Sequence, residues 1–289
     1  MSYIAELFSV EGRVVVITGG GSGLGYHMAE AFVKSGSKVY ITGRREHVLQ
    51  ESAEKLNQLG PGTASYFAAD MTSQDDIKKL VAFVESRETV VDVLINNSGI
   101  AFSDPTVSHL DTLERLQEVF SNSDPTKWDK VYRTNIWGPF AATVAFLHLL
   151  GAAAKARPNE GRGSVIMISS VNSNSWNPYM TGLAYNSSKA ALNLVTKMLA
   201  AKIYPHGIRL NILSPGPFPT DMNDPTQEQG MTNPSNYHRL PMGRVGSKED
   251  IAGAALYFAS KASAFTHGAD LLVDGGLALV QNGTNKIQP

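Results

Sequence analysis

A tyrosine and a lysine four positions apart, in Tyr185-Asn-Ser-Ser-Lys189, are the residues of this chain best suited to chemistry. The flanking alanines and leucines predict a helix, in which residues four apart lie on one face, one turn above each other. A free phenol has a pKa of about 10, so it is a poor proton donor or acceptor at neutral pH. A lysine charge about 5 Å away lowers that pKa by about two units at an effective dielectric of about 20. The pair therefore predicts acid–base chemistry by Tyr185, with an exposed tyrosine beside a solvated lysine as the alternative.

A glycine-rich turn near the N-terminus predicts that the chain also binds a dinucleotide. The apolar run 13–18 predicts a buried strand, and residues 23–35 predict the helix that follows it. The glycines allow a tight turn and a close approach of the pyrophosphate, whose charge is stabilised at the helix N-terminus. A flexible turn is the alternative. The candidate residues of the turn are Thr18, Gly19, Ser22, Gly23, Leu24 and Gly25.

Several motifs, in order and approximate spacing, resemble those of the short-chain dehydrogenases/reductases, in the compact single-domain branch of that family. The resemblance covers almost the whole chain and implies an oxidoreductase that uses a nicotinamide dinucleotide. It also implies a homo-oligomer, either a dimer or a tetramer, joined through helices at 127–156 and 183–204. Besides the two motifs above, the matching residues are Asp70, Asn96-Asn97-Ser98-Gly99, Asn135, Ile168-Ser169-Ser170, Pro215-Gly216, Gly243-Arg244-x-Gly246 and Asp274-Gly275-Gly276.

Composition and charge argue against several other classes of protein. The 289 residues are 43% hydrophobic, so we expect a single domain over 1–289 with a C-terminal tail from about 276. A net charge of −1 gives no basic field for nucleic acid. The chain has no cysteine and no histidines three or four apart, so we expect neither a disulfide nor a metal site. Without a signal-like N-terminal segment, we expect a cytoplasmic protein that binds no membrane.

Strand-like and helix-like stretches alternate, which is typical of a parallel sheet with helices on both faces. Right-handed crossovers then predict an α/β fold, a doubly wound parallel sheet (Rossmann fold) of seven strands, with the ligand crevice at their carboxyl ends. The predicted strands are 13–18, 38–42, 64–68, 92–95, 164–168, 208–213 and 270–273. The predicted helices are 23–35, 46–58, 74–86, 127–156, 183–204 and 248–260.

The end of the second predicted strand bears on which dinucleotide is bound. An NAD site places a carboxylate there for the ribose 2′-hydroxyl, whereas an arginine accommodates the 2′-phosphate of NADP. Gly43 stands where the carboxylate would be, and Arg44 and Arg45 follow it. The sequence therefore favours NADP(H) over NAD(H), with Arg44 as the stronger candidate for the phosphate. Two solvated arginines that open the next helix are the alternative.

Other residues enter the cofactor site through the family resemblance. It implies that Asp70, followed by Met71, meets the adenine, with capping of the next helix as the alternative for Asp70. It also implies that Asn97, Ser98 and Gly99 line the adenosine and ribose side, whereas Asn96 is structural. At the nicotinamide end it places Pro215, Gly216, the backbone of Phe218 and Thr220.

Four residues form the predicted catalytic set. Tyr185 donates the proton in reduction and accepts it in the reverse reaction, while Lys189 lowers its pKa and binds the nicotinamide ribose. Ser170 donates to the substrate oxygen. By resemblance, Asn135 holds a water that links Lys189 to solvent. The structural alternatives are a Ser170 that satisfies a strand end and an Asn135 that stabilises a helix irregularity.

Two other residues compete with Ser170 for its place in this set. Ser170 and Tyr185 are 15 positions apart (185 − 170), which is longer than usual in the family. Asn172 falls at the usual separation and is a rival for the substrate oxygen, with Ser173 as a weaker one. Ser170 is preferred because it ends an apolar strand in the context Ile-Ser-Ser.

The substrate is predicted only as a small carbonyl compound or alcohol. The long segment 103–125 predicts a short amphipathic helix over 107–120, which packs structurally, covers the pocket or joins subunits. The polar stretch after Thr220, which reaches about Arg244, predicts a lid over the substrate. Side chains that could give an apolar pocket, or equally pack in the core, are Phe102, Trp176, Tyr179, Phe218, Met222 and Met231.

Together these features predict an NADP(H)-dependent reductase that converts a ketone to a secondary alcohol, or catalyses the reverse oxidation. Two alternatives stay open. One is a relative that keeps the cofactor only as a scaffold, and the other is an epimerase or a reductase of C=N or C=C bonds. The fold does not separate them, because function resides in the site.

Overall fold

Apolar runs rich in β-branched residues form seven strands, which pair in parallel into one sheet. The computed structural model describes residues 2–102, 111–176, 182–228 and 230–281. The strand order is β3-β2-β1-β4-β5-β6-β7, so the order reverses between β1 and β4. This confirms the predicted doubly wound sheet, and each strand begins and ends within two residues of its predicted bounds. The strands are β1 (Val14–Thr18), β2 (Lys38–Gly43), β3 (Thr63–Ala68), β4 (Val93–Asn96), β5 (Ser164–Ile168), β6 (Arg209–Pro215) and β7 (Asp270–Val273).

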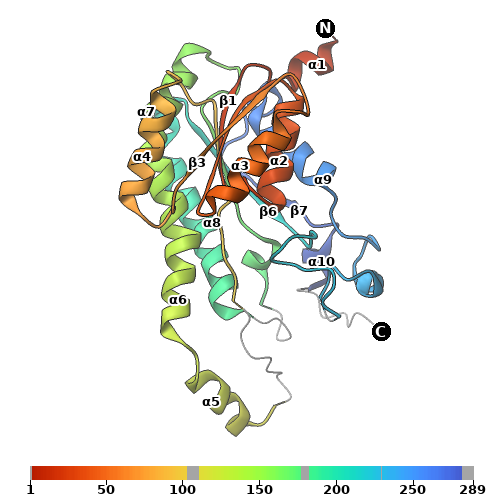
Figure 1. Cartoon of the computed structure of the whole chain (residues 1–289). Helices are drawn as coiled ribbons and strands as arrows, with labels where there is room; N and C mark the ends of the chain where they lie inside the picture. The colour runs from red at the N-terminus through yellow and green to blue at the C-terminus, as the bar shows by residue number, and fades with distance from the viewer. Residues whose placement is uncertain (1, 103–110, 177–181, 229, 282–289) are drawn as a thin grey trace.

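Helices cover both faces of this sheet. On one face lie α2, α3 and α9, and on the other lie α4, α7 and α8 (Figure 1). In the described part of the chain the α-helices are α1 (Tyr3–Leu7), α2 (Gly23–Lys34), α3 (Glu46–Leu56), α4 (Gln74–Glu85), α5 (Leu113–Ser121), α6 (Pro125–Tyr132), α7 (Gly138–Ala156), α8 (Leu183–Ile203), α9 (Lys248–Ala259) and α10 (Leu277–Gln281).

Successive strand residues point to opposite faces and build one core on each side of the sheet. Val15 and Ile17 of β1 belong to the core that contains Phe32 of α2. Val16, between them, belongs to the opposite core with Phe146 of α7. All five side chains are fully buried. Burial on both faces explains why the strand reads as a continuous apolar run rather than an alternating one.

The helix predicted over 127–156 is interrupted. A five-residue π-helical segment, η1 (Arg133–Trp137), separates α6 from α7. The run Pro125–Ala156 is long and apolar enough to cross a membrane by length and composition alone. In the fold, α7 buries Ala142, Phe146 and Leu150 in the core beneath the sheet, which accounts for its apolar composition.

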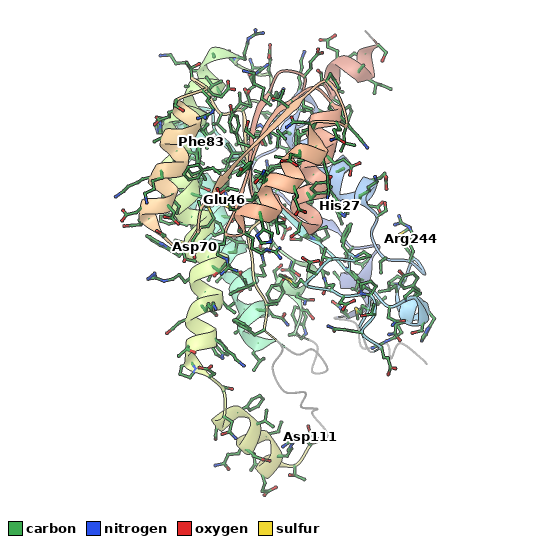
Figure 2. All side chains as sticks on the ribbon, viewed as in Figure 1. His27, Glu46, Asp70, Phe83, Asp111 and Arg244 are labelled. Carbon is green, nitrogen blue, oxygen red and sulfur yellow. The ribbon has the colours of Figure 1, made fainter. Side chains whose placement is uncertain are left out.

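The inserted segment forms the predicted short helix, which is α5. It lies beyond the end of α6, away from the sheet, with Asp111 just before it (Figures 1 and 2). Of its residues, Val119 is buried, whereas Leu113 is exposed. Residues 103–110 of this segment, and with them part of the predicted range 107–120, lie outside the described residues.

The predicted C-terminal tail is wrong at its start. Residues from 277 form the helix α10 instead, and Leu277 and Gln281 are buried. The reason is tertiary, because Leu277 packs with residues from distant parts of the chain, which a reading of the local sequence does not reveal. Residues 282–289 of the predicted tail lie outside the described residues.

A buried carboxylate ties segments together at the amino-terminal edge of the sheet. Asp92, which precedes β4, is 1% exposed. One of its oxygens accepts from the backbone N–H of Val14 at 2.8 Å, and the other accepts from Nη1 of Arg162 at 2.8 Å. Because a buried charge is costly unless it is paired, these bonds fix β1 and the turn before β5 against β4.

Replacing Asp92 with alanine removes the partner of both the Arg162 guanidinium and the Val14 amide. We expect the free energy of unfolding to fall by about 3 kcal/mol, as measured by urea denaturation followed by circular dichroism. The control is Asp75→Ala, which removes an exposed carboxylate 3.6 Å from Lys78 and should leave the midpoint unchanged. Similar losses in the two variants would contradict this account.

Candidate functional site

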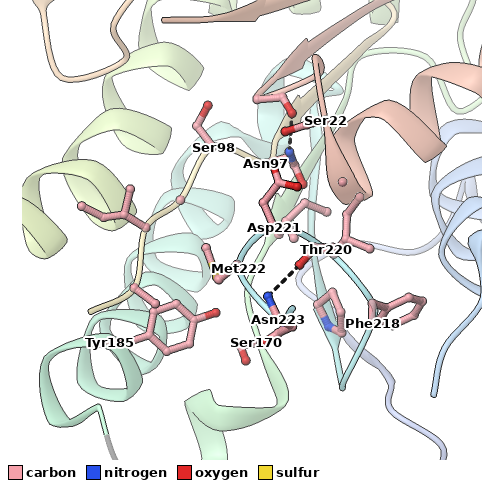
Figure 3. Close-up of a pocket in the computed structure, with 18 of the residues that line it drawn as sticks. Ser22, Asn97, Ser98, Ser170, Tyr185, Phe218, Thr220, Asp221, Met222 and Asn223 are labelled. Atoms are coloured by element: carbon pink, nitrogen blue, oxygen red, sulfur yellow. Dashed lines mark hydrogen bonds between the residues drawn. The ribbon is translucent and has the colours of Figure 1, made fainter. Parts of the chain in front are cut away.

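A cleft of about 900 Å³ runs along the carboxyl ends of the strands, where the strand order reverses (Figure 3). It is large enough for a dinucleotide and a small substrate. Three predicted site residues, Thr18, Gly25 and Asn135, lie behind its wall. The predicted site residues that line it are Gly19, Ser22, Gly23, Leu24, Arg44, Arg45, Asp70, Met71, Asn97, Ser98, Gly99, Ser170, Tyr185, Lys189, Pro215, Gly216, Phe218 and Thr220.

The glycine turn is held by contacts that leave no room for side chains. Gly19 has a φ of +66°, a region that favours glycine, and its N–H donates to the Thr42 carbonyl at 2.7 Å. A Cβ on Gly25 would lie 2.2 Å from the Gly19 carbonyl oxygen. The side-chain amide of Asn97 donates to the carbonyls of Thr18 at 3.0 Å and Gly19 at 3.1 Å. The end of β4 therefore holds the turn in place from outside.

Asn97 has a structural role that the sequence did not predict for it. We expected Asn96 to be structural, and it is buried and donates to Oγ1 of Thr143 at 2.9 Å. Asn97 lines the cleft, as expected of a cofactor contact, but its amide also supports the glycine turn. The hydroxyl oxygen of Thr18 accepts from the N–H groups of Asn97 and Ser98, each at 3.0 Å. The signal that was missed is the pairing of β4 with β1, which places these residues side by side.

Gly43, Arg44 and Arg45 lie together in the cleft wall, as predicted from the second strand. A Cβ on Gly43 would meet only one leucine methyl, at 3.8 Å, so the space in front of this residue is open. Both arginine side chains are exposed at its edge. Arg45 donates to the Ser22 hydroxyl at 3.4 Å and lies 3.8 Å from the Asp221 carboxylate. Two cations around an open space form a suitable site for a phosphate.

Asp70 lines the cleft and also shapes the entry into α4. Its Oδ1 accepts from the N–H and the hydroxyl of Thr72, both at 2.8 Å. The N-cap of α4 is Ser73, whose hydroxyl accepts from the N–H of Asp76 at 3.2 Å. Figure 2 shows Asp70 at the cleft end of α4. The helix is therefore capped by Ser73 and not by Asp70, which was the structural alternative. Asp70 instead holds the turn before α4 from a position in the cleft wall.

Tyr185 and Lys189 lie on one face of α8, as their spacing predicts. The ammonium nitrogen of Lys189 is 5.8 Å from the centre of the Tyr185 ring. Lys189 is 4% exposed, and its Nζ donates to the carbonyl of Ile168, at the end of β5, at 2.8 Å. The Tyr185 hydroxyl lies on the side of Ser170 (Figure 3). The two side chains thus converge on the end of β5 rather than pointing apart.

The pKa of Tyr185 shifts in the direction opposite to the predicted one. Burial raises the pKa of Tyr185, and a hydrogen bond with Ser170 offsets only part of this rise. Burial also lowers the pKa of Lys189, to about 8. The predicted net lowering of the Tyr185 pKa is therefore wrong. The physical reason is burial, which is the first cause of the shift for both side chains.

The geometry groups Ser170, rather than its rivals, with Tyr185. Ser170 is the N-cap of a 3₁₀ turn, η2 (Val171–Asn174), and its hydroxyl accepts from the N–H of Asn172 at 3.2 Å. The Tyr185 hydroxyl lies on the side of Ser170 in the cleft (Figure 3), and its interaction with Ser170 acts to lower the pKa of Tyr185. Asn172 also lines the cleft, whereas the Ser173 hydroxyl lies outside it and accepts from the Asn193 amide at 3.0 Å. Ser170 therefore satisfies a local turn and faces the cleft at the same time.

Asn135 sits in the π-helical segment η1, which is the helix irregularity named above as its structural alternative. Its buried amide makes two bonds with the backbone of Ile100, each 2.9 Å long, and donates to Ser188 at 3.0 Å. A Cβ on Gly99 would lie 3.4 Å from Oδ1 of Asn135 and 3.5 Å from Nζ of Lys189. The glycine thus leaves a gap that borders both polar atoms.

The loop after β6 crosses the glycine turn. Thr220 and Asn223 form an isolated bridge, and the N–H of Asn223 donates to the Thr220 carbonyl at 3.0 Å. The Thr220 methyl lies 3.3 Å from the position of a Cβ on Gly23. Phe218 is buried, and its ring fills the space that a side chain on Gly246 would need. Phe218 therefore packs in the core and lines the cleft at the same time.

Only some of the apolar residues predicted for the substrate pocket line the cleft. Trp176 is 76% exposed and does not line the cleft, and Tyr179 lies outside the described residues. Among the described residues, no cluster of His, Asp and Glu side chains is arranged to hold a metal. The predicted side chains that do line the cleft are Phe102, Phe218, Met222 and Met231. Lining residues that the sequence reasoning missed include Val171, Arg239, Leu277 and Gln281.

The chain is similar along nearly its whole length to known enzymes. The model of a family described as enoyl-(acyl carrier protein) reductase matches residues 19–278. The short-chain dehydrogenase/reductase PhomF of Diaporthe leptostromiformis is 33% identical over 276 residues, which cover 94% of this chain and 93% of that protein. Gluconate 5-dehydrogenase of Gluconobacter oxydans is 32% identical over 275 residues, which cover 95% of this chain and 98% of that enzyme.

Solved structures give the same result for the fold and its cleft. The Pseudomonas aeruginosa RhlG/NADP active-site complex superposes with a TM-score of 0.81 and 28% identity, covering 94% of this chain and 99% of that chain. A gluconate 5-dehydrogenase from Burkholderia cenocepacia, in complex with NADP and tartrate, has a TM-score of 0.79 and 27% identity, covering 96% of this chain and all of that chain. Sequence, sheet order and cleft lead to one conclusion: this chain belongs to the short-chain dehydrogenase/reductase family of oxidoreductases.

Proposed function

We propose that the protein transfers a hydride between NADP(H) and a ketone or secondary alcohol, with Tyr185 as the proton donor and acceptor. The observation that carries this proposal is the convergence of Tyr185, Lys189 and Ser170 at the end of β5, in the wall of one cleft. The same cleft begins at the glycine turn. There the Ser22 side chain makes no capping bond to α2, so the first N–H groups of this helix suit the pyrophosphate oxygens.

Each member of the catalytic set has a distinct role in this proposal. The bound nicotinamide supplies the hydride for the carbonyl carbon. Ser170 donates a hydrogen bond to the substrate oxygen, and Tyr185 delivers a proton to it, so the charge that develops on this oxygen is neutralised. Lys189 stabilises the resulting tyrosinate and binds the nicotinamide ribose. A water in the gap at Gly99 would connect Nζ of Lys189 to the side-chain oxygen Oδ1 of Asn135. Through this water, the proton given to the substrate would be restored.

The preference for NADP(H) rests on the end of β2. An acidic residue in place of Gly43 would repel a 2′-phosphate, whereas the open space there admits one. Arg44 offers a planar fork to this phosphate, and Arg45 adds a second cation beside Ser22. Two related proteins of similar fold, RhlG and a gluconate 5-dehydrogenase, are described as complexes with NADP. Both lines of support favour the same dinucleotide.

Reduction of a C=C bond is the second candidate, and one observation favours it. The family model that matches this chain is described as an enoyl-(acyl carrier protein) reductase. The position of Ser170 and Tyr185 in the same part of the cleft favours a carbonyl substrate, because two hydroxyl groups can then meet one substrate oxygen (Figure 3). Oxidation of NADPH with a panel of ketones, imines and enoyl thioesters separates the two reactions. Tight NADPH binding without turnover of any of them would favour a cofactor scaffold instead.

A homo-oligomer formed through α7 and α8 is also part of this proposal. These helices pack one face on the sheet and expose apolar side chains on the other. Exposed apolar surface of this kind on neighbouring helices is typical of contacts between subunits. The exposed apolar residues are Val144 of α7 and Leu194 and Met198 of α8.

Tyr185→Phe removes the proposed acid while keeping the ring. We expect kcat for ketone reduction to fall about 10³-fold, with NADPH affinity within about twofold of the wild type. Steady-state rates and NADPH fluorescence titration measure the two quantities. Tyr132→Phe is the matched control, because its hydroxyl donates to Ser187 on α8 and lies outside the cleft. A rate loss in Tyr185→Phe no larger than in this control would refute the assignment.

Arg44→Ala tests the choice of cofactor. We expect NADPH binding to weaken about tenfold while NADH binding is unchanged, because only the 2′-phosphate requires the guanidinium. Fluorescence titration with both cofactors gives the two dissociation constants. Arg45→Ala is the comparison variant and should have a smaller effect, since Arg45 is already engaged by Ser22 and Asp221. Equal weakening of NADPH and NADH in Arg44→Ala is the result that the proposal does not allow.

The lowered pKa of Lys189 predicts a pH dependence of reduction. Its ammonium is charged below a pH of about 8 and loses its proton above it. We therefore expect kcat/KM to fall by about tenfold per pH unit above that value, in a pH–rate profile of the wild type. Lys189→Arg stays protonated, so its profile should lack this break although its rate is lower. A wild-type profile that is flat from about pH 7 to about pH 10 would show that this charge is not needed.

A further inference from the structure

The C-terminal helix α10 buries two of its residues, Leu277 and Gln281, of which Leu277 is apolar. Asp274 caps this helix, since its two carboxylate oxygens accept from the N–H of Gly276 at 2.9 Å and of Ala278 at 2.8 Å. Leu277 is 1% exposed, whereas Leu279, two residues later, is 84% exposed. The cap and the burial together fix the position of Leu277 in the fold.

Leu277 belongs to a small apolar cluster, distinct from the two cores that cover the sheet. The cluster joins Leu277 to Val171 and Leu240, and Met231 packs against it. Val171 directly follows Ser170, and Leu240 comes from the loop region after β6. Leu277, Val171 and Met231 also line the cleft, and we call these three residues the apolar wall. The apolar wall is therefore shared between the loop after β6, the residue next to Ser170, and α10.

We propose that Leu277 is a specificity-determining residue, and that the apolar wall holds the carbon arm of a ketone substrate whose length Leu277 limits. This inference rests on the proposed function and adds a substrate class to it. An ionic group against Leu277, Val171 and Met231 would lose its hydration without gaining a partner from them. A methylene group buried there instead strengthens binding by about fourfold. The wall thus selects ketones with an apolar arm of limited length.

The residues near the apolar wall agree with a selection for apolar substrate arms. Arg239, a charged lining residue on this side, has an exposed side chain and lies next to Leu240 in the chain rather than in the wall. Gln281, which lines the cleft one helical turn after Leu277, is uncharged. Met231 is unbranched and adapts its shape to an apolar ligand more easily than a branched residue. Leu277, fixed by the cap on α10, is the rigid part of the wall.

Leu277→Ala tests the inference with unbranched 2-alkanones from 2-butanone to 2-nonanone, reduced with NADPH. The substitution removes about three carbons from the wall, which gives room for about two more methylenes of substrate. We expect the ratio of kcat/KM for 2-nonanone to that for 2-butanone to rise about tenfold over the wild type. This ratio does not depend on the fraction of folded enzyme, so the stability lost with a buried leucine does not affect it.

Leu279→Ala is the matched control, because it removes the same atoms from the same helix at an exposed position and should keep the wild-type ratio. Equal losses for short and long ketones in Leu277→Ala would overturn the proposal, because a purely structural residue affects both alike. A wild type that reduces other ketones but none of the 2-alkanones would overturn it too, and would leave the proposed function intact. Failure of the wild type to bind NADPH in a fluorescence titration would instead refute the proposed function, and this inference with it.

Discussion

The burial of one ammonium group is the constraint on which the arrangement of the site depends. Lys189 is almost fully enclosed, and its Nζ donates to the carbonyl of Ile168 at the last residue of β5. A buried cation is costly unless polar groups surround it, and the cost appears here as a pKa lowered to about 8. The bond fixes α8 against the sheet. It thereby holds Tyr185, one helical turn earlier, beside Ser170, which follows the same strand two residues later.

The sheet order supplies the rest of the site. Because β4 lies between β1 and β5, Asn97 at the end of β4 holds the glycine turn after β1, and Gly99 comes close to Lys189. These residues line the cleft between the glycine turn and the end of β5, where they would hold a bound dinucleotide. Behind the cleft wall, the side-chain amide of Asn135, in the π-helical segment, holds the backbone of Ile100 through two hydrogen bonds. Segments far apart in the chain thus share one wall because parallel strands end at the same edge.

A small apolar cluster connects the outer parts of the cleft. The cluster of Val171, Leu240 and Leu277 joins the loop after β6 and the C-terminal helix to the residue next to Ser170. It is small compared with the two cores on the sheet, so it adds less stability than they do.

Much of this protein follows from the sequence alone. Local patterns determined the bounds of the strands to within two residues and the place of the glycine turn. They also placed Arg44 at the end of the second strand and put Tyr185 and Lys189 on one face of a helix. Each of these features depends only on neighbours within one element. Only the tertiary structure decided that the Asn97 amide supports the glycine turn, and that Ser170 rather than Ser173 meets Tyr185. It also decided that Leu277 forms part of the cleft, and that burial raises the pKa of Tyr185. These outcomes depend on burial and on contacts between distant segments, which no local pattern contains.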